Sequence, residues 1–402
     1  MQWAIIACRA VRSFGVGVLT VSLPLALQED EVGTTEISLI FAAGIAGATM
    51  YISQSSRFSQ HLGRPGTISF FTGAMAIGVS VLAWVHISWV LMLAALLGAV
   101  SLQPNISPQA SFEQAILADS ANGDVARTAV FAWYNAISTL SMAFGSLVGG
   151  ISIPGGNHTH MSLVSVLLAM SSAAYLLLTF KAGPKVLAQK EAQKEALLVP
   201  HDLTLRHCPH RQRILGLAAF FAIDSFAGGM VISSMLIHWL SRRFASAPLV
   251  LGTLFAWQGL LAAGSFFAAT WLAARIGLVN TMVFTHLPSN ITLIVIPFCR
   301  DPNVVYILFL LRAATAQMDV PTREAFMTGA VDKQERVACA STIMIARSVA
   351  CVLGPPVAAL VWKAFSPTVP LVLAGAIKCA YDLSFLAVYR SVQSTDAGST
   401  AS

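Results

Sequence analysis

Long apolar runs separated by short polar turns dominate the chain. Crossing a bilayer takes about 20 mostly apolar residues in a helix, because every backbone N–H and C=O must be hydrogen-bonded within the segment. Twelve runs approach that length, which predicts an all-α integral membrane protein with twelve transmembrane helices. They lie near residues 4–27, 37–52, 68–85, 87–102, 129–151, 163–180, 214–239, 249–274, 279–297, 304–317, 337–362 and 369–388.

One hydrophilic segment, residues 181–213, divides these runs six and six. It contains the helix-prone KVLAQKEAQKEALL and the basic HDLTLRHCPHRQR, which is typical of a linker between two bundles. We therefore expect a six-helix bundle over residues 1–180, a cytoplasmic linker over 181–213, a second six-helix bundle over 214–390 and a disordered tail over 391–402.

The composition agrees with a lipid surrounding, since 56% of the residues are hydrophobic and only 10% are charged. We interpret the net charge of +6 as the excess of Lys and Arg that cytoplasmic loops of membrane proteins carry, and not as a surface that binds nucleic acid. The six cysteines include no C-x-x-C pair, and His207-Cys208-Pro209-His210 is interpreted as a solvated loop in preference to a metal site. We expect no metal, no cofactor, a monomer and a lipid bilayer as the surrounding phase.

The basic residues are distributed unevenly between the two sides of the predicted bundle. With the N-terminus in the cytoplasm, the inner loops carry fifteen Lys and Arg residues and the outer loops carry four. The positive-inside rule then predicts that both termini are cytoplasmic, and we expect the plasma membrane as the location.

Segments in the two halves match at nearly constant offsets, which indicates an internal repeat. An even number of spans in each half makes the two repeats parallel, an arrangement typical of alternating access. The matches are residues 13–17 with 225–229 at an offset of 212, residues 61–64 with 275–278 at 214, and Gly145 with Gly354 at 209.

Two of these repeated segments resemble motifs of the major facilitator superfamily. The loop after the second run ends in Gly63-Arg64, similar to the end of the family signature Gly-x-x-x-Asp-Arg-x-Gly-Arg. The segment RAVRSFG and the segments FEQAILAD and QMDVPTREAF look like those of bacterial-type permeases. The resemblance implies a facilitator fold, with gating loops that contain Gly63, Arg64, Arg275 and Gly277.

The fifth run ends in Gly145-Ser146-Leu147-Val148-Gly149-Gly150, which is similar to the end of the family's antiporter motif, and the eleventh contains Gly354-Pro355. This resemblance favours export. The alternative is close packing of helices, for which Gly145, Gly149, Gly150, Gly354 and Pro355 are equally suited.

Eight charged residues fall inside the predicted spans. At roughly 3 kcal/mol each, they would cost on the order of 20 kcal/mol if they faced lipid, so they must pair or face water. They are Arg9, Arg12, Asp224, Arg312, Asp319, Arg347, Lys378 and Asp382.

Two pairings are expected among these charges, and one charge is expected to stay unpaired within the bundle. Arg12 and Asp224 are repeat equivalents, and the resemblance implies that their spans face one another across a central cavity, so we expect an ion pair there. Lys378 and Asp382 are spaced i, i+4, which predicts a structural ion pair. For Arg9, we expect that the side chain reaches the cytoplasmic interface.

The tenth run supplies the candidates for substrate recognition. Arg312, Asp319 and Arg323 stand at i, i+7 and i+11, on one stripe about 40° wide if the helix is continuous. Arg312 and, in the eleventh run, Arg347 then lie near mid-membrane, where anionic groups would be met. Further cavity candidates are Arg12, Asp224, Thr315 beside the stripe, and Trp257 and Gln258, which either line the cavity or pack.

The function that these features favour is a secondary transporter that moves a small organic solute by alternating access. Asp224 and Asp319 are the candidates for proton coupling, and efflux antiport is one form of the hypothesis. A facilitated carrier and a non-transporting receptor on the same fold are the alternatives. An integral membrane enzyme is disfavoured, because the sequence has no H-E-x-x-H and no Gly-x-Ser-x-Gly.

Overall fold

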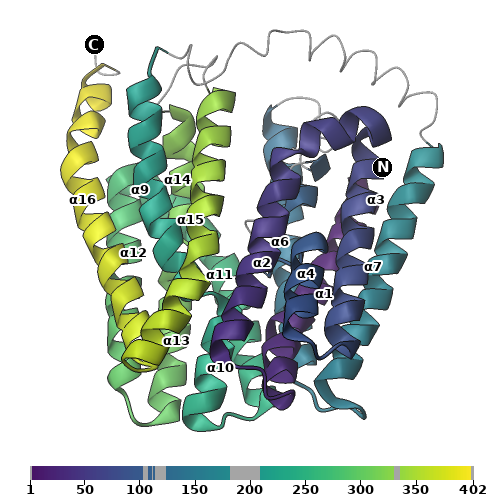
Figure 1. Ribbon diagram of the computed structural model, residues 1–402. Helices are drawn as coiled ribbons and strands as arrows, with labels where there is room; N and C mark the ends of the chain where they lie inside the picture. The colour runs from purple at the N-terminus through teal and green to yellow at the C-terminus, as the bar shows by residue number, and fades with distance from the viewer. Residues whose placement is uncertain are drawn as a thin grey trace. The chain divides into compact units, whose positions relative to one another are not determined.

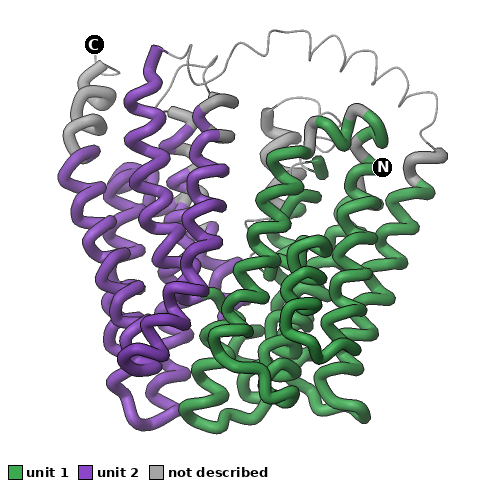
Figure 2. Tube along the Cα trace, viewed as in Figure 1, with its two compact units in different colours: residues 1–201, 232–256 green, residues 202–231, 257–402 purple. Residues whose placement is uncertain are grey.

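The computed structural model describes residues 2–102, 107–110, 112–113, 124–181, 209–329 and 336–399. Every regular element within these residues is a helix (Figure 1). The chain forms two compact units, one of residues 1–201 and 232–256 and one of residues 202–231 and 257–402, which we call unit 1 and unit 2 (Figure 2).

In unit 1, α1 packs against both α6 and α7, and α3 packs against α7. The shorter α4 lies against α2 and α3, and α10 lies against α1. The helices of this unit are α1 (Gln2–Glu29), α2 (Thr34–Ser53), α3 (Ser55–Trp84), α4 (Ser88–Leu97), α6 (Asp124–Gly149), α7 (Gly156–Lys181) and α10 (Ser233–Phe244).

In unit 2, α9 packs against α15 and α16, and α12 packs against α13, α14 and α16. The helix α11 (Pro248–Ile276) begins in unit 1 and continues into unit 2. The other elements are α9 (Arg211–Met230), α12 (Leu278–Val295), the short η2 (Ile296–Phe298), α13 (Pro302–Ala316), α14 (Asp319–Gly329), α15 (Arg336–Ala364) and α16 (Val369–Ser399).

The helices have the lengths and composition that a bilayer requires. Among the described residues, nine helical stretches are long and apolar enough to cross a membrane, and Ser88–Leu97 and Pro302–Ala316 are shorter apolar helices. The all-α membrane architecture is confirmed, and the number of twelve spans stays a prediction. Residues 182–208 of the predicted linker lie outside the described residues, and α16 continues to Ser399, where the sequence predicted a disordered tail.

In unit 1, α1 and α6 cross at glycines with their backbones in contact. A Cβ atom added to Gly17 would overlap the backbone oxygen of Met142, and one added to Gly145 would overlap that of Phe14. Further along α6, a Cβ on Gly149 would come within 2.6 Å of the backbone oxygen of Val18. Small residues allow this close approach, which is how helices associate without a hydrophobic driving force in lipid.

In unit 2, α9 and α15 cross in the same way. A Cβ on Gly229 would overlap the backbone oxygen of Cys351, and one on Gly354 would overlap the backbone of Gly229. Pro355 and Pro356 follow inside α15, which continues to Ala364. Because Gly17 and Gly229 are repeat equivalents, as are Gly145 and Gly354, the two units use one crossing twice, and close packing accounts for these glycines.

The two glycines of the predicted gating loops share an unusual backbone conformation. Gly63 has φ 70° and ψ 167°, and Gly277 has φ 83° and ψ 166°. Side chains other than glycine rarely adopt this region. Gly63 kinks α3, whose first turns from Ser55 are helical where the sequence predicted a loop, and Gly277 precedes α12. The repeat seen in the sequence is therefore also a repeat of local structure.

We predict that Gly354→Ala lowers the thermal stability of the purified protein in detergent. The methyl group would displace the backbone of α9, and overpacking costs typically 1–3 kcal/mol. The matched control is Gly264→Ala, at a helical position with nothing within 4 Å of the added Cβ, where alanine gains up to about 1 kcal/mol of helix propensity. Equal melting temperatures for the two variants would contradict the crossing described above.

Candidate functional site

A buried carboxylate lies at the centre of the polar interactions of unit 1. Arg12 Nη1 lies 2.5 Å from Glu113 Oε1, and Arg12 Nη2 donates to Oε2 at 2.8 Å. Glu113 is fully buried, and Arg12 is only 2% exposed. This two-pronged geometry is the strongest form of ion pair between these groups.

Two tyrosines complete the environment of Glu113. The hydroxyl of Tyr134 on α6 donates to Oε2 at 2.6 Å, and that of Tyr175 on α7 donates to Oε1 at 2.6 Å. The carboxylate thus accepts four hydrogen bonds from α1, α6 and α7. Full satisfaction of this kind is what makes a buried charge tolerable.

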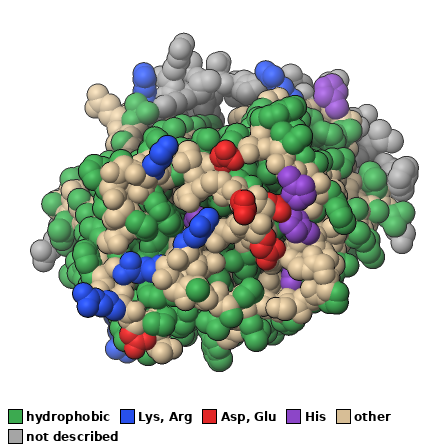
Figure 3. Space-filling view, turned by 60° about the horizontal axis from the view of Figure 1, so that its bottom comes forward, with side chains coloured by type: hydrophobic (Ala, Val, Ile, Leu, Met, Phe, Trp, Pro, Cys, Tyr) green, Lys and Arg blue, Asp and Glu red, His purple; other side chains and the backbone are tan. Residues whose placement is uncertain are grey.

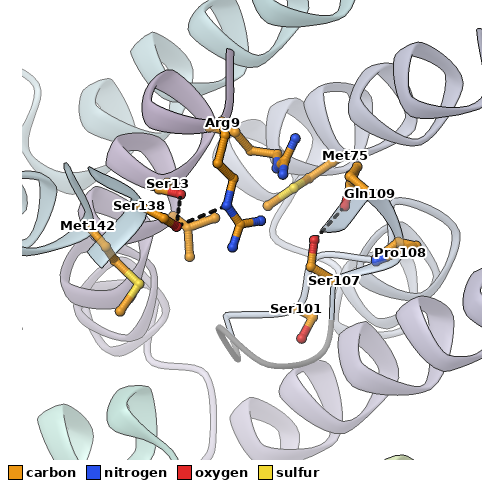
Figure 4. A pocket seen from close by; sticks show the side chains of 12 residues that line it. Arg9, Ser13, Met75, Ser101, Ser107, Pro108, Gln109, Ser138 and Met142 are labelled. Atoms are coloured by element: carbon orange, nitrogen blue, oxygen red, sulfur yellow. Dashed lines mark hydrogen bonds between the residues drawn. The ribbon is translucent and has the colours of Figure 1, made fainter. Parts of the chain in front are cut away.

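Arg9 lies one helical turn before Arg12 and borders a pocket within unit 1 (Figure 4). Its Nε donates to Ser138 Oγ at 2.9 Å, and its Nη1 stays 3.8 Å from Glu113 Oε2. The guanidinium also stands over the ring of Tyr134 at 5.2 Å. The expectation that Arg9 reaches the membrane interface is therefore wrong, because its side chain is directed toward buried groups of unit 1.

The pocket combines hydroxyl, amide and apolar groups. Ser13 and Ser138 share a hydrogen bond of 2.8 Å on one side, and Ser107 donates to Gln109 Oε1 at 2.9 Å on the other (Figure 4). The remaining wall is formed by Arg12, Val16, Met75, Ala99, Ser101, Pro108 and Met142. Such a lining suits a small solute with one polar end and one apolar end.

In unit 2, two buried carboxylates are held by permanent cations. Lys378 Nζ on α16 lies 2.5 Å from Asp224 Oδ1 on α9. Arg323 Nη1 lies 2.6 Å from Asp319 Oδ2 on α14 and 3.8 Å from Asp224 Oδ2. The predicted pair of Arg12 with Asp224 is thus replaced by two pairs, each within one unit.

The third buried carboxylate of unit 2, Asp382, has a different kind of partner. His286 Nδ1 lies 2.9 Å from Oδ1, and Asn290 Nδ2 donates to Oδ2 at 2.8 Å. The predicted i, i+4 pair of Lys378 with Asp382 does not form, because α9 and α12 offer each side chain a closer partner.

Arg312 has no such partner. No carboxylate of the described residues lies within 4 Å of it, and its buried Nε makes no hydrogen bond there. The predicted stripe with Asp319 is interrupted, because α13 ends at Ala316 and α14 begins at Asp319. Pro321 explains the break, since it lacks the N–H that a continuous helix would bond to residue 317.

The other cavity candidates have separate surroundings. Arg347 donates from Nε to Ser225 Oγ at 3.0 Å, and the hydroxyl of Thr315 donates to the backbone oxygen of Arg312 at 3.3 Å. On α11, Trp257 is 54% exposed, while the Oε1 of Gln258 is buried with no hydrogen-bond partner in the described structure.

Of the two arginines of the predicted gating loops, Arg275 lies in the last turn of α11, and Arg64 lies inside α3 directly after the kink at Gly63. Arg275 is exposed and stacks on the ring of Trp271 at 4.1 Å. The side chain of Arg64 lies outside the described residues.

A further polar cluster lies at the end of unit 1 where α1 stops. The carboxylate of Asp30 lies 3.0 Å from His86 Nδ1 and 3.2 Å from His158 Nε2, and the centres of the two imidazole rings are 5.8 Å apart. Figure 3, which brings this end of the molecule forward, shows acidic and histidine side chains gathered on its face. No group of three or more His, Cys, Asp or Glu side chains among the described residues is placed to hold a metal ion.

Sequence reasoning missed five of these residues. Glu113 and its tyrosines were passed over because the segment FEQAILAD was used only as a resemblance. The signal for His286 and Asn290 was their i, i+4 spacing inside an apolar run, which places both on one helix face.

Long apolar helices around buried, paired charges define a multi-pass α-helical membrane protein. Residues 5–355 match the sequence profile of the Major Facilitator Superfamily, and the chain belongs to that family. It is accordingly a transporter and not an enzyme.

Known proteins agree with this assignment. The chain is 23% identical over 392 residues to the uncharacterized membrane protein YJR124C of Saccharomyces cerevisiae, covering 88% of this chain and 86% of the relative. Two solved structures share the fold. The nucleoside transporter NupG has a TM-score of 0.77 at 13% identity, and the human organic anion transporter MFSD10 (TETRAN) has 0.67 at 16%, each covering 96% of this chain and 98% of its own.

We predict that Glu113→Gln strongly destabilises the protein, because it leaves the buried Arg12 without a counter-charge. Breaking one side of a buried ion pair typically costs about 3–5 kcal/mol. The loss would appear as a lower melting temperature in detergent.

The matched control is Glu29→Gln, since Glu29 is exposed and bonds Asn157 at 2.7 Å. A Glu113→Gln protein as stable as this control would contradict the structural role assigned to the carboxylate.

Proposed function

We propose that this transporter carries small organic anions by alternating access, coupled to the movement of protons. The observation that carries the proposal is Arg312 on α13, which is partly buried, has a buried Nε without a hydrogen bond and has no carboxylate partner in the described structure. An anionic solute would supply the missing partner.

Burial makes such an arginine costly. A charged group that leaves water without a counter-charge loses several kcal/mol of solvation, on the order of the energy of a good ion pair. In unit 2, Lys378 and Arg323 avoid this cost through Asp224 and Asp319. An arginine that keeps its donors free is typical of a site that binds carboxylate or phosphate through two parallel hydrogen bonds.

We include two polar residues from other helices of unit 2 in the proposed substrate-binding group. Arg347 has only the hydroxyl of Ser225 as its recorded hydrogen-bond partner, and Gln258 offers a free amide oxygen. Trp257, which is half exposed, supplies an apolar surface. We keep Thr315 in this group because it lies one turn from Arg312.

Unit 1 supports the same substrate class independently. The pocket beside Arg9 has a cation, several hydroxyl groups and the side chains of Met75 and Met142. Arg12 is fully engaged by Glu113 and serves to hold Arg9 and the carboxylate in place. A small amphipathic anion matches this combination of charge and apolar wall.

The names of the similar structures point in two directions. The human neighbour is an organic anion transporter and the other carries nucleosides, and at 16% and 13% identity both support the fold alone. We favour the anion because a nucleoside carries no charge to neutralise Arg312.

Proton coupling is supported by the three carboxylates buried in unit 2. Asp224 and Asp319, the candidates from the sequence, could each release a cation on protonation. Export rests only on the resemblance of residues 145–150 to the antiporter motif, and the close packing of those glycines accounts for them without reference to direction.

We also propose that the protein works as a monomer in the plasma membrane with both termini in the cytoplasm. The orientation is supported by the basic residues of the loops, of which fifteen are inner and four are outer.

The transport prediction uses proteoliposomes that enclose a pH dye. Wild-type protein should take up p-aminohippurate in preference to uridine, glucose and tetraphenylphosphonium, with a change in internal pH. Arg312→Gln should reduce this uptake about 10- to 100-fold, because a hydrogen bond to a charged group contributes roughly 1.5–3 kcal/mol.

The control is Arg300→Gln, at an exposed arginine outside the proposed site. Preferred transport of uridine would replace the anion by a nucleoside. Uptake without any proton movement would favour a facilitated carrier, and no transport of any compound would favour a receptor.

The topology prediction uses an epitope tag inserted after residue 190. An antibody should reach the tag only after the plasma membrane is permeabilised, whereas a tag between residues 153 and 154 should be labelled on intact cells. The reverse pattern would overturn the proposed orientation.

A further inference from the structure

Asp382 is set apart from the other buried carboxylates of unit 2 by its partner. Asp224 is held by Lys378 and Asp319 by Arg323, and these cations keep their charge at any physiological pH. The recorded partners of Asp382 are an imidazole and an amide. Imidazole is the side chain whose charge ordinarily changes between about pH 5 and 8.

The geometry of the pair places a proton between the two groups. His286 Nδ1 and Asp382 Oδ1 are 2.9 Å apart, and both atoms are acceptors when neither carries a proton. The bond therefore holds one proton, and Asn290 fixes the second oxygen of Asp382 from one turn along α12. With Nδ1 occupied, the free position for a further proton is Nε2 of His286.

The pair is almost completely removed from solvent, with the side chains of His286 and Asp382 only 7% and 2% exposed. A change of charge at such a place acts strongly on its surroundings, because little water screens it. The pair can thus transmit its protonation state to neighbouring charges.

The surrounding charges balance one another when His286 is neutral. The positive charges of Lys378, Arg323 and Arg347 then equal the negative charges of the three buried aspartates. One added proton leaves this group with a net charge of +1. The groups that act on the pair or on its charged neighbours are Lys378, Cys379, Tyr381 and Asp382 on α16, Asp319 and Arg323 on α14, Asp224 on α9 and Arg347 on α15. Among the described residues, the charged groups that act most on His286 belong to α14 and α16, and none belongs to α13, which also packs on α12.

We propose that the pair of His286 and Asp382, fixed by Asn290, is the proton-binding site of this transporter. The proposal rests on the proposed proton coupling and moves it from Asp224 and Asp319 to a pair that sequence reasoning did not consider. Hydronium delivers a proton to Nε2 of His286 and leaves as water, and the imidazolium stays bonded to the Asp382 carboxylate.

This site gives a physical link between the proton and the substrate. The protonated pair adds one positive charge to the group that contains Arg347, and this charge favours the binding of an anion in unit 2. When the anion leaves, the protonated state of the pair becomes unfavourable and the proton is released. Asp224 and Asp319 act in this scheme as fixed counter-charges, since releasing either from its cation would leave that cation buried and unpaired.

The first test needs no substrate. In purified wild-type protein with ¹⁵N-labelled histidine rings, one imidazole signal should titrate with a midpoint between about pH 5 and 8 and should be missing in His286→Gln. Asp382→Asn should move this midpoint to lower pH, because the carboxylate that stabilises the imidazolium is gone. A His286 signal that does not change between pH 5 and 8 would overturn the proposal.

The second test compares two modes of p-aminohippurate transport in proteoliposomes. Accumulation driven by a pH gradient should fall at least tenfold in Asp382→Asn and in the double variant His286→Gln, Asp382→Asn. Exchange at equal pH on both sides needs no net proton movement, so it should fall less than gradient-driven accumulation does. The double variant replaces both groups by uncharged amides, so that the site cannot bind a further proton. It is chosen because it leaves no imidazolium without its carboxylate.

Asp301→Asn is the matched control, since Asp301 is exposed and caps α13, and asparagine caps a helix equally well. If the variants keep gradient-driven accumulation, the site is wrong although the transporter is proton-coupled. If they lose exchange as well, the pair serves the fold or the substrate, which also overturns the proposal. If wild-type protein itself moves no protons, the proposed function fails, whatever the titration of His286 shows.

Discussion

A charge buried among apolar helices must be matched by other groups of the protein, and in unit 1 this requirement is met at Glu113. Its carboxylate accepts from Arg12, Tyr134 and Tyr175, so that one residue connects α1, α6 and α7. Lipid offers no alternative partner, which makes the arrangement specific as well as stabilising. The same bonds hold Arg9 beside its pocket, so the position of the candidate site follows from the ion pair.

The helices that carry these charges are held by contacts between backbones. Gly17 and Gly145 join α1 to α6, and Gly229 and Gly354 join α9 to α15. In a membrane, where apolar side chains gain little by leaving lipid for protein, such close approach supplies the dispersion energy that packs helices. The repetition of the crossing in both units agrees with duplication of one structural plan.

In the proposed mechanism, charges with permanent partners belong to the scaffold, and charges without them serve substrate and proton binding. Arg12, Lys378 and Arg323 have carboxylate partners within their own units, and these ion pairs stabilise the packing of the helices that carry them. Arg312 lacks one among the described residues, and Asp382 is matched by a group that can gain or lose charge. A carrier needs both properties, because a binding site must be completed by its substrate and a coupled site must exist in two protonation states.

The sequence by itself determined the membrane class, the helical fold, the family and the repeat, because these depend on local patterns such as apolar length and the glycines at positions 63 and 277. It also identified most of the buried charges, since a charge inside an apolar run is conspicuous. Only the tertiary structure decided which charges meet. Lys378 is four residues from Asp382 yet bonds Asp224, and Arg12 finds Glu113, 101 residues away. Partners of this kind are set by which helices cross and at what height. A helix break such as the one before Asp319 also changes the direction of every later side chain relative to the helix before the break. Helical spacing predicts neighbours on one helix, whereas a buried charge is satisfied by whichever helix lies closest.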